Sequence, residues 1–389
     1  MLAGVPRGIF RSSWVSRPAG ELYFPVCLAQ RPLGSVVPDA PKRLPTIDEL
    51  RASMRREGTG GEVLSDSFGR FHDYLRISLT ERCNLRCLYC MPEDGVDLSP
   101  KDQILSAEEV IGISKLFVKA GVRKIRLTGG EPTVRPDLLE IVEGLGALSG
   151  LEKICITSNG IVLGRKLEGL QRAGLTHVNI SLDTLEEDRY THLTRRPGLK
   201  KVLGTVTKAI DLGFDPVKIN CVLMRGENDD EIGKFVQMTE NQPVDIRFIE
   251  YMPFDGNRWE QQKMIPYREV MSMIEHQTGR TLVKLKDGPN ETARGYRVEG
   301  YRGSVSFITS MSENFCSSCN RLRITADGNL KVCLFGHDEV SLRDALRSGA
   351  SEDQLYSVIR DAVRRKRARH AGMLGIAKSR NRPMILIGG

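Results

Sequence analysis

Apolar and polar positions follow two alternating periods between residues 74 and 253. Short runs rich in β-branched residues are separated by longer segments in which apolar residues recur at helical spacing. The predicted strands cover residues 75–79, 124–128, 153–157, 178–182, 217–222 and 246–251. The predicted helices begin after Ser106, where Glu109 completes a capping-box pattern, and continue at 136–148, 162–173, 199–212 and 229–240.

This alternation predicts an α/β fold with a parallel sheet, because short crossovers of one hand return the chain to the same edge. The pattern alone leaves open whether the sheet forms an open or partial barrel or is doubly wound. Residues of unusual chemistry follow five of the strands, at 83–90, 129–132, 158–160, 181–183 and 250–253. Since catalytic residues of barrels collect at the C-terminal ends of strands, these segments predict a site on that rim.

Residues 1–64 lack this alternation. The first 40 residues carry several arginines and serines but only two acids, Glu21 and Asp39, which is typical of a mitochondrial transit peptide. A tail without an address is the alternative. The Pro- and charge-rich stretch at 38–61 is interpreted as a linker, so the predicted folded regions are a barrel at 65–255 and a C-terminal capping region at 256–389.

Composition adds two constraints. The chain has 389 residues, 40% of them apolar, which is enough for a large core, and no apolar run approaches the ~20 residues of a membrane span. The formal charge of +8 suits a polyanionic partner such as nucleic acid, a membrane surface or a nucleotide phosphate. Plain surface charge is the alternative until the positive residues are located.

Six of the nine cysteines form two trios. Cys83, Cys87 and Cys90 are spaced C-x3-C-x2-C, and Cys316, Cys319 and Cys333 are spaced C-x2-C-x13-C. Clustered pairs without a secretory signal favour metal over disulfides. A structural zinc site and a [4Fe-4S] cluster both use four positions, so three cysteines leave one position open unless a distant ligand arrives.

The second trio has two interpretations. A predicted hairpin at 324–332, with Asp327-Gly328 at its turn, brings Cys333 back towards the C-x2-C pair. His337 lies four residues after Cys333 and could complete a zinc ribbon. The other interpretation is a second iron–sulfur cluster with an open iron.

Several cations lie inside the predicted strands, where burial is costly without a partner. They are Arg76, Lys124, Arg126, Lys218 and Arg247, and Arg321 and Arg323 follow the second C-x2-C pair. The first three share the parity of interior-facing positions, and two guanidiniums on one strand face suit a phosphate or a purine. The pattern therefore predicts an anion inside the barrel, with a solvated strand face as the alternative for Arg321 and Arg323.

The first trio, with Tyr89 before its last cysteine, and the Gly-Gly-Glu-Pro turn at 129–132 resemble the radical S-adenosylmethionine enzymes. In that family S-adenosylmethionine chelates the open iron of a [4Fe-4S] cluster, and its reductive cleavage gives a 5′-deoxyadenosyl radical that abstracts a hydrogen atom. The resemblance implies five contacts: Tyr89 and Met252 at the adenosyl group, Gly130 and Glu131 at the methionine amine, and Ser181 at the carboxylate.

From about residue 65 onwards, the motifs together resemble the GTP 3′,8-cyclases of molybdenum cofactor biosynthesis, in their animal mitochondrial form. The resemblance implies a partial (β/α)6 barrel with a second [4Fe-4S] cluster on the second trio. It implies hydrogen abstraction at ribose C3′ of GTP and closure of a C3′–C8 bond. The implied GTP site comprises Arg76, Lys124, Arg126, Thr157, Lys218, Arg247, Arg321, Leu322 and Arg323. Ser158 stands where threonine is more usual and keeps the hydroxyl.

The same resemblance implies that guanine docks on the open iron of the second cluster and that Gly388 and Gly389 reach into the pocket, although a frayed tail is the alternative. It implies an electron donor, the synthase of cyclic pyranopterin monophosphate as a partner, and a mitochondrial matrix location. No nucleic acid or membrane partner is expected, and a homodimer is left open.

Two other functions stay open: a radical enzyme that modifies peptides or tRNA, and a non-enzymatic iron–sulfur regulator of nucleic acid. Cations inside the strands favour a buried nucleotide over the first, and the Gly-Gly-Glu-Pro turn is not needed by the second. Residues 341–347 and 352–370 are predicted to be helical. The basic run at 364–369 is interpreted as a solvated helix face rather than as a nuclear signal or RNA patch.

Overall fold

The structure, a computed structural model, describes residues 63–388 apart from Gly256, Arg258, Pro289, Asn314, His337, Ala371, Met373, Leu374 and 377–381. The chain divides into two compact units, 1–43 and 44–389, and every described residue belongs to the second. The predicted transit peptide and linker, Cys27, His337 and Gly389 lie outside the described residues.

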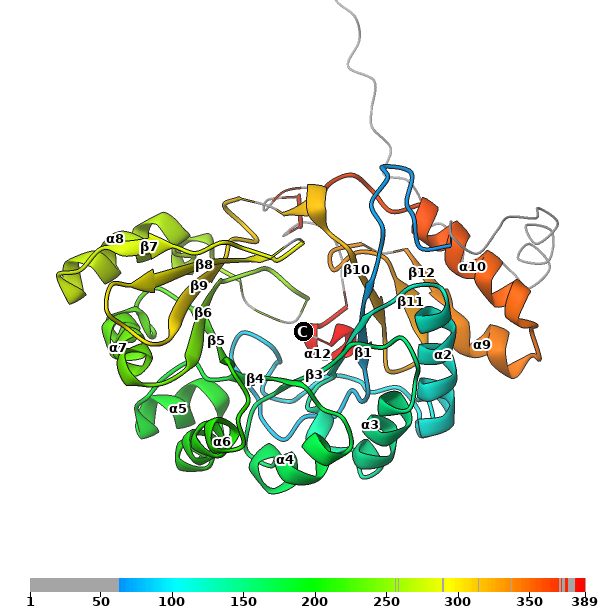
Figure 1. Cartoon of the computed structure of the whole chain (residues 1–389), viewed down its shortest axis with the longest axis horizontal. Helices are drawn as coiled ribbons and strands as arrows, with labels where there is room; N and C mark the ends of the chain where they lie inside the picture. Colours follow the sequence, from blue (N-terminus) through cyan, green and yellow to red (C-terminus); the bar gives the residue numbers. More distant parts are fainter. Residues whose placement is uncertain are drawn as a thin grey trace, which may run out of the picture. The chain divides into compact units, whose positions relative to one another are not determined.

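One twelve-stranded sheet forms the frame, in the order β12-β11-β10-β1-β2-β3-β4-β5-β6-β9-β8-β7. The strands are β1 (Tyr74–Ser78), β2 (Lys124–Thr128), β3 (Lys153–Ser158), β4 (His177–Ser181), β5 (Val217–Leu223), β6 (Val244–Glu250), β7 (Leu282–Lys284), β8 (Ala293–Val298), β9 (Ser304–Ile308), β10 (Arg321–Ile324), β11 (Asn329–Lys331) and β12 (Glu339–Ser341). The eight strands from β10 to β9 run parallel. Antiparallel strands end the sheet on both sides, so the curved sheet stays open (Figure 1).

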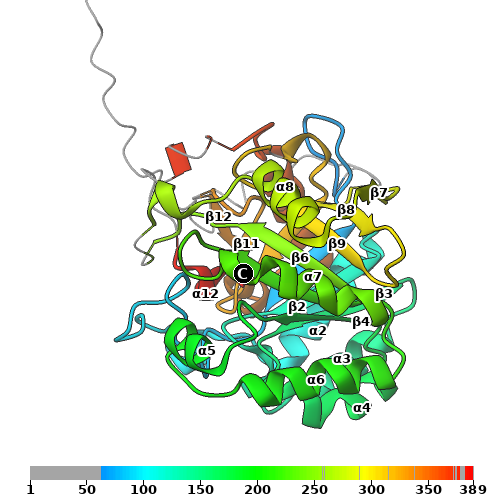
Figure 2. The same ribbon diagram turned by 90° about the vertical axis from the view of Figure 1, so that its left-hand side faces the viewer.

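Helices cover the outer face of this sheet, where Figure 2 shows α3, α4 and α6 beside one another. The helices are α2 (Ala107–Lys119), α3 (Leu138–Gly146), α4 (Leu163–Arg172), α5 (Glu187–Thr194), α6 (Leu199–Asp211), α7 (Ile232–Asn241), α8 (Tyr267–Thr278), α9 (Leu342–Arg347), α10 (Glu352–Arg364) and α12 (Met384–Ile387). The short α12 differs from the others because it lies on the inner side of the strands (Figure 1). Within the described part of the chain, none of the helices combines the length and apolar character needed to traverse a bilayer.

Helix α2 shows how local sequence and packing agree. The Ser106 hydroxyl accepts from the Glu109 backbone N–H at 3.2 Å, and the Glu109 carboxylate accepts from the Ser106 N–H at 2.8 Å, which confirms the capping box. Its inner face buries Val110, Ile113 and Phe117 in the main core. Burial of each such side chain stabilises the fold by roughly 1.5–3 kcal/mol.

The partial-barrel prediction is confirmed, because β1 to β6 follow one another in order and each lies within two residues of its predicted bounds. The predicted hairpin at 324–332 is also present, since β10 and β11 pair antiparallel. The boundary at 255 stays a prediction. The region after it supplies β9 and β10, which pair directly with β6 and β1.

One helix was missed and the end of another was predicted wrongly. Helix α5 was not predicted, because only Tyr190, Leu193 and Thr194 of its eight residues are buried and the rest show no clear apolar face. The helix predicted at 352–370 ends at Arg364, and the basic run continues in irregular backbone. This early end changes where one of the basic side chains lies.

Candidate active site

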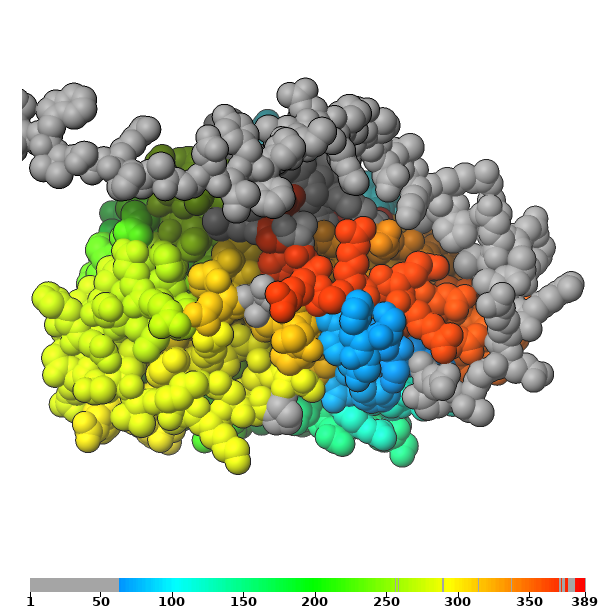
Figure 3. Space-filling model, turned by 90° about the horizontal axis from the view of Figure 1, so that it is seen from above, coloured from blue at the N-terminus to red at the C-terminus, as the bar shows by residue number. Residues whose placement is uncertain are grey.

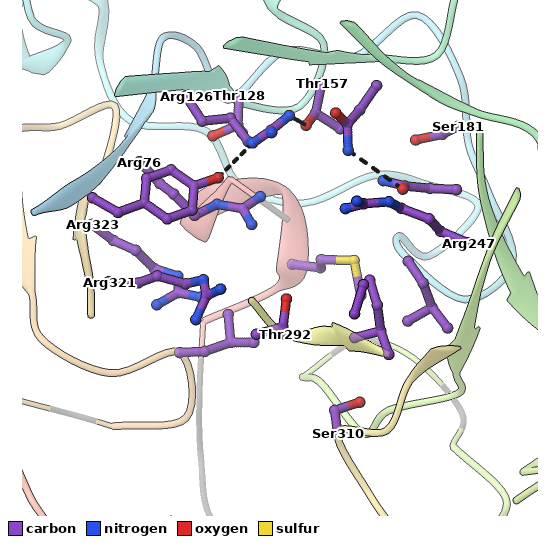
Figure 4. Close-up of a pocket in the computed structure, with 18 of the residues that line it drawn as sticks. Arg76, Arg126, Thr128, Thr157, Ser181, Arg247, Thr292, Ser310, Arg321 and Arg323 are labelled. Carbon is purple, nitrogen blue, oxygen red and sulfur yellow. Dashed lines mark hydrogen bonds between the residues drawn. The ribbon is translucent and has the colours of Figure 1, made fainter. Parts of the chain in front are cut away.

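The strands surround a cavity of about 660 Å³. Both cysteine trios line it, together with Tyr89, Gly130, Glu131, Ser181, Met252, Arg76, Lys124, Arg126, Thr157, Lys218, Arg247, Arg321 and Arg323. Leu322 is an exception, because strand alternation turns its side chain to the opposite face, where it is fully buried in the core. The close-up of this cavity shows the labelled arginines converging from several strands (Figure 4).

Strand register explains why the cations meet. Along one row Arg321 lies opposite Tyr74, which lies opposite Lys124. Along the row two residues further on, Arg323 lies opposite Arg76, which lies opposite Arg126. Because alternate residues of neighbouring parallel strands share a face, β10, β1 and β2 present their cations to one side.

Tyr74 sits at the centre of these cations and was not predicted as a site residue. Its hydroxyl accepts from Arg126 Nε at 2.6 Å, while the Lys124 ammonium lies 4.6 Å and the Arg321 guanidinium 5.5 Å from the ring centre. Burial raises the pKa of the phenol, but Arg126, Arg76 and Lys124 outweigh burial and lower the pKa to about 8. The sequence did carry a signal for Tyr74: it lies two residues before Arg76 on the same strand, so both side chains face the same side of the sheet.

Other cations are held by specific partners. Arg126 Nη1 donates to the Thr157 hydroxyl at 3.1 Å (Figure 4), and Arg247 Nε donates to the Asp245 carboxylate at 2.6 Å. Burial and the neighbouring Arg247 lower the pKa of Lys218 to about 8. Positive charge is therefore less favourable at Lys218 than on an exposed lysine, and a bound anion would stabilise it.

Arg76 and Arg323 lie deeper in the strands and are also crowded. Burial, opposed by Tyr74 but reinforced by Arg323, lowers the pKa of Arg76 to about 9. Burial also lowers the pKa of Arg323, whose buried Nε has no hydrogen-bond partner among the described residues. Buried guanidinium donors facing a cavity are the arrangement that a phosphate or a purine oxygen would satisfy.

The first trio lies in the loop that follows β1. The backbone N–H of Arg86 donates to the Thr194 carbonyl and that of Leu88 to the Leu193 carbonyl, so the end of α5 fixes this loop. Burial raises the pKa of each thiol of the trio, and neighbouring thiols raise the pKa of Cys87 and Cys90 further. The chain alone does not favour the thiolates, which a cationic metal centre would.

The turn at 129–132 packs directly against the loop of the first trio. A Cβ at Gly129 would lie 2.5 Å from the Thr80 carbonyl oxygen, and one at Gly130 would lie 2.5 Å from that of Arg82. The backbone N–H groups of Gly130 and Glu131 donate to the same two carbonyls. These glycines therefore allow two backbone segments to lie in direct contact.

Glu131 is buried and already accepts several hydrogen bonds from the chain. Its donors are the Thr133 backbone and hydroxyl, the Ser158 hydroxyl and the Asn159 backbone N–H. The Asn159 side chain then donates to that of Asn84 at 2.7 Å. The carboxylate thus joins three of the predicted rim segments, including the loop of the first trio.

Tyr89 and Met252 lie side by side, as their predicted shared ligand requires. The Asn257 side-chain amide donates to both of their carbonyls, at 3.1 and 2.9 Å. The Tyr89 hydroxyl donates to Asp183 at 3.0 Å, and burial raises the pKa of Asp183 to about 6. Asn257 was missed because no local pattern distinguishes it from an ordinary loop residue.

The second trio has a cation close to one of its sulfur atoms. The Lys366 ammonium lies 3.5 Å from Cys319 Sγ, and Arg70 Nη1 donates to the Cys316 carbonyl at 2.6 Å. Burial raises the pKa of Cys319, but Lys366 and Arg321 outweigh burial and lower the pKa to about 7. Burial raises the pKa of Cys316.

The C-terminal segment enters the cavity from inside the sheet, where Met384 and Ile385 line it. Arg76 Nη2 donates to the Gly388 carbonyl at 3.3 Å. Gly388 has a φ of +76°, and a Cβ there would collide with the Thr128 hydroxyl, so only glycine fits. The structure thus places Gly388 at the cations, while Gly389 lies outside the described residues.

The donor chemistry of the two trios fits iron–sulfur clusters. All six cysteines are free thiols that border one cavity, and soft thiolates suit such clusters. Among the described residues, no His, Cys, Asp or Glu side chains are grouped in threes so that they could hold a metal ion. A four-iron cluster is broader than a single ion and sets its ligands farther apart. The fit of the two trios to such clusters therefore rests on their thiol donors and on their common position at the cavity wall.

An open sheet of parallel strands, a three-cysteine loop after the first strand and a Gly-Gly-Glu-Pro turn after the second define a radical S-adenosylmethionine protein. The profile of the Radical SAM superfamily matches residues 77–239, and that of Molybdenum Cofactor Synthesis C matches residues 244–372. The crystal structure of Streptococcus suis SuiB bound to S-adenosylmethionine shares the fold, with a TM-score of 0.51 at 16% identity over 75% of this chain and 68% of that chain.

Curated relatives define the family more narrowly. The chain is 57% identical to "GTP 3′,8-cyclase, mitochondrial" of Arabidopsis thaliana, over 84% of each chain, and 42% identical to "GTP 3′,8-cyclase" of Listeria monocytogenes, over 79% of this chain and 92% of the relative. It is 59% identical to "Molybdenum cofactor biosynthesis protein 1" of Bos taurus, over 83% of this chain and 51% of that protein. The chain therefore belongs to the GTP 3′,8-cyclase family, and it spans about half the length of the mammalian relatives.

Proposed function

We propose that this chain is a GTP 3′,8-cyclase that converts GTP to (8S)-3′,8-cyclo-7,8-dihydroguanosine 5′-triphosphate in molybdenum cofactor biosynthesis. The observation that carries the proposal is one cavity bordered by two cysteine trios and a row of buried cations. A radical enzyme acting on peptides or tRNA would not require guanidiniums from β1, β2 and β10 inside the sheet.

Two [4Fe-4S] clusters are assigned, one to Cys83, Cys87 and Cys90 and one to Cys316, Cys319 and Cys333. With S-adenosylmethionine bound, the first supplies the 5′-deoxyadenosyl radical that removes the C3′ hydrogen of GTP. Tyr89 and Met252, joined by Asn257, would hold the adenosyl group, and Ser181 would meet the methionine carboxylate. Gly130 and Glu131 would bind the amine. The Glu131 carboxylate already accepts hydrogen bonds from the chain, so it also fixes the turn around the amine.

The substrate triphosphate would relieve the repulsion among the cavity cations. Arg76, Lys124, Arg126, Lys218, Arg247, Arg321 and Arg323 are assigned to it with the Thr157 hydroxyl. Several of these groups are already oriented, since Tyr74 and Thr157 fix Arg126 and Asp245 fixes Arg247. Pre-oriented donors bind a phosphate at a lower entropic cost than mobile ones.

Arg321 and Arg323 lie next to the second trio, which places the guanine end of GTP there in this proposal. The C3′ radical would attack guanine C8, and the resulting aminyl radical would take up one electron and one proton. The second cluster is assigned as the source of that electron. Gly388 and Gly389 would close the cavity beside Arg76.

Further assignments follow from the relatives' names and from the family. They are a lyase-type enzyme in the mitochondrial matrix, an external electron donor, and the synthase of cyclic pyranopterin monophosphate as the next enzyme. A homodimer is left open.

Anaerobic reconstitution tests the proposal. The full chain is loaded with iron and sulfide, the iron is counted, and S-adenosylmethionine, dithionite and GTP are added. About eight irons per chain are expected from two clusters of four. Formation of 5′-deoxyadenosine together with loss of GTP supports the proposal. Absence of 5′-deoxyadenosine would reject radical chemistry, and its formation without GTP consumption would reject the substrate.

A further inference from the structure

One lysine of the C-terminal basic run is buried, contrary to its interpretation as a solvated helix face. Helix α10 ends at Arg364, and the next residues leave the helix. Arg364, Arg365 and Arg367 are exposed, whereas Lys366 is 4% exposed. Burying an ammonium is costly unless its donors find acceptors, so its contacts indicate its role.

The Lys366 ammonium has three protons to donate and acceptors on several sides. It lies 2.8 Å from His72 Nε2, 3.0 Å from the Arg321 carbonyl and 3.5 Å from Cys319 Sγ. The Cys319 carbonyl lies at 3.4 Å. The His72 imidazole and the Arg321 carbonyl, the two nearest acceptors, take two of the three protons. The third proton is directed at Cys319, where the carbonyl oxygen and the Sγ of the proposed cluster ligand lie at similar distances.

His72 is arranged to accept rather than donate at this contact. Its Nδ1 lies 2.9 Å from the Leu64 carbonyl, which can only accept, so Nδ1 carries the proton and Nε2 is the acceptor. Burial and the nearby Lys366 lower the pKa of His72 to about 4, so the ring is neutral near pH 7. A neutral imidazole leaves the positive charge of this contact on Lys366.

Residues 63–73, which include His72, supply the other groups that surround Lys366. Arg70 Nε pairs with Asp66 at 2.6 Å, and Asp66 lies 3.7 Å from His72 Nε2. Arg70 also donates to the Arg367 and Ala368 carbonyls, which ties this segment to the chain around Lys366. Figure 3 shows this N-terminal segment, in blue, beside the orange-red C-terminal segment.

A positive donor at a cluster sulfur favours the more negative, reduced state of the cluster, because reduction adds an electron to the group that the donor stabilises. We propose that Lys366, oriented by His72, is a positioning residue that donates to Cys319 Sγ and raises the reduction potential of the second cluster. The inference rests on the proposed second cluster. A cluster with a higher potential is reduced more easily than one held by thiolates alone. It could therefore take an electron from the external donor and pass it on.

The test isolates the second cluster in the full chain carrying Cys83→Ala, Cys87→Ala and Cys90→Ala. Iron is counted, and the midpoint potential is measured by redox titration followed by electron paramagnetic resonance. Lys366→Met removes the charge at similar length, Lys366→Arg keeps it, and Arg365→Met removes an exposed neighbouring charge as the matched control. Circular dichroism compares the folding of all variants.

Lys366→Met is expected to lower the potential so that, at a fixed potential, the reduced-to-oxidised ratio falls about tenfold, which is 59 mV for one electron. Arg365→Met should leave the potential unchanged, and Lys366→Arg should retain most of it. An unchanged potential in a folded, iron-loaded Lys366→Met protein overturns the inference. If that variant does not fold, Lys366→Gln replaces it, and an unchanged potential there has the same meaning.

The proposed function and this inference fail differently. A parent protein without about four irons in the triple-alanine background rejects the second cluster itself. If the parent has its full iron content but Lys366→Met leaves the potential unchanged, only the role of Lys366 is rejected. His72→Phe adds a separate check, because loss of the acceptor should shift the potential in the same direction as Lys366→Met but by less.

Discussion

Tyr74 places an uncharged ring among charged groups, and its hydroxyl and face organise three of them. Tyr74 lines the cavity and contributes to binding by fixing where the cations point. The hydroxyl is the part that matters most for Arg126, which would otherwise lose a close acceptor in a buried position.

Replacing Tyr74 with Phe should weaken GTP binding. A hydrogen bond to a charged group is worth about 1.5–3 kcal/mol, so the dissociation constant should rise roughly ten- to a hundredfold. Anaerobic equilibrium binding measures it. Tyr296→Phe is the matched control, because a lysine also lies over that ring, at 4.8 Å, but outside the cavity. Equal affinity in both variants would contradict the role given to Tyr74.

The pH dependence of binding follows from two shifted groups. Lys218 and Tyr74 both have a pKa of about 8, so each loses a proton as the pH rises through 8, and each loss makes the cavity less positive. GTP affinity should therefore fall between pH 7.5 and 9. Combining Lys218→Arg with Tyr74→Phe removes both titrations and should flatten the profile, although binding will be weaker throughout.

The same Lys218 shift has an opposite effect on folding. Between the folded pKa of about 8 and the ordinary value of 10.5, the unfolded chain binds the extra proton. Stability from this group therefore rises with pH in that window. Calorimetry on the ligand-free protein separates this trend from the binding trend.

At the level of elements, α12 depends on a clamp just before it. Arg382 pairs with Asp327 at 3.0 Å and with Glu339 at 2.7 Å, and Glu339 also accepts from the fully buried Lys331. These contacts fasten the tail to the hairpin that carries β11 and to β12. The tail position is thus set from the second-trio region rather than from the barrel helices.

Arg382→Gln should release α12 and reduce GTP turnover about tenfold or more, while the iron content stays unchanged. Arg225→Gln is the control, because it breaks a half-exposed pair with Glu269 far along the chain. Turnover and C-terminal proteolysis rates report the two effects. Normal turnover with a freely cleaved tail would show that α12 is not needed.

Gly388 offers a sharper test of the same element. Gly388→Ala should abolish most turnover, since the methyl group meets Thr128 and the backbone is left-handed. Gly279→Ala is matched in φ, at +64°, but has open space around it, so it separates backbone strain from collision. Deleting Gly388 and Gly389 should likewise stop turnover with both clusters retained, and full turnover by that truncated protein would refute the role of the tail.

Some elements could be predicted from sequence and others could not, for physical reasons. The β/α units were predictable because their periodicity is local. The pairing of β10 with β1 joins residues about 250 positions apart, and no local pattern encodes it. Lys366 was misplaced for a related reason: its neighbours are all arginines, and only the end of α10 turns it inward.

The candidate site divides in the same way. Cysteine spacing and strand alternation indicated the trios and most of the cations, because both patterns depend only on residues that are near one another in the sequence. Tyr74, Asn257 and His72 act through partners from distant strands and loops, so their roles appear only in the folded chain. Leu322 was assigned to the GTP site because it lies between Arg321 and Arg323 in the sequence. Strand alternation instead turns its side chain away from the cavity and into the core.

At the scale of the whole molecule, the sheet cannot be divided cleanly near residue 255. Strands β1 and β6 would each become an edge without β10 and β9, leaving unpaired backbone groups in the middle of the protein. Residues 63–255 expressed alone should therefore aggregate. Soluble yield and circular dichroism check this, and recovery on co-expression with 256–389 is expected. A soluble, cooperatively folded fragment would support the predicted boundary.

The inward position of α12 also bears on how the protein can be handled. Gly388 is buried beside Arg76 and Thr128, so residues joined after it, such as a purification tag, are expected to disturb its fit against these two residues. Tagged at that end, the protein could purify with intact clusters and still be inactive. An inactive C-terminal fusion would therefore say nothing about the chemistry of the site.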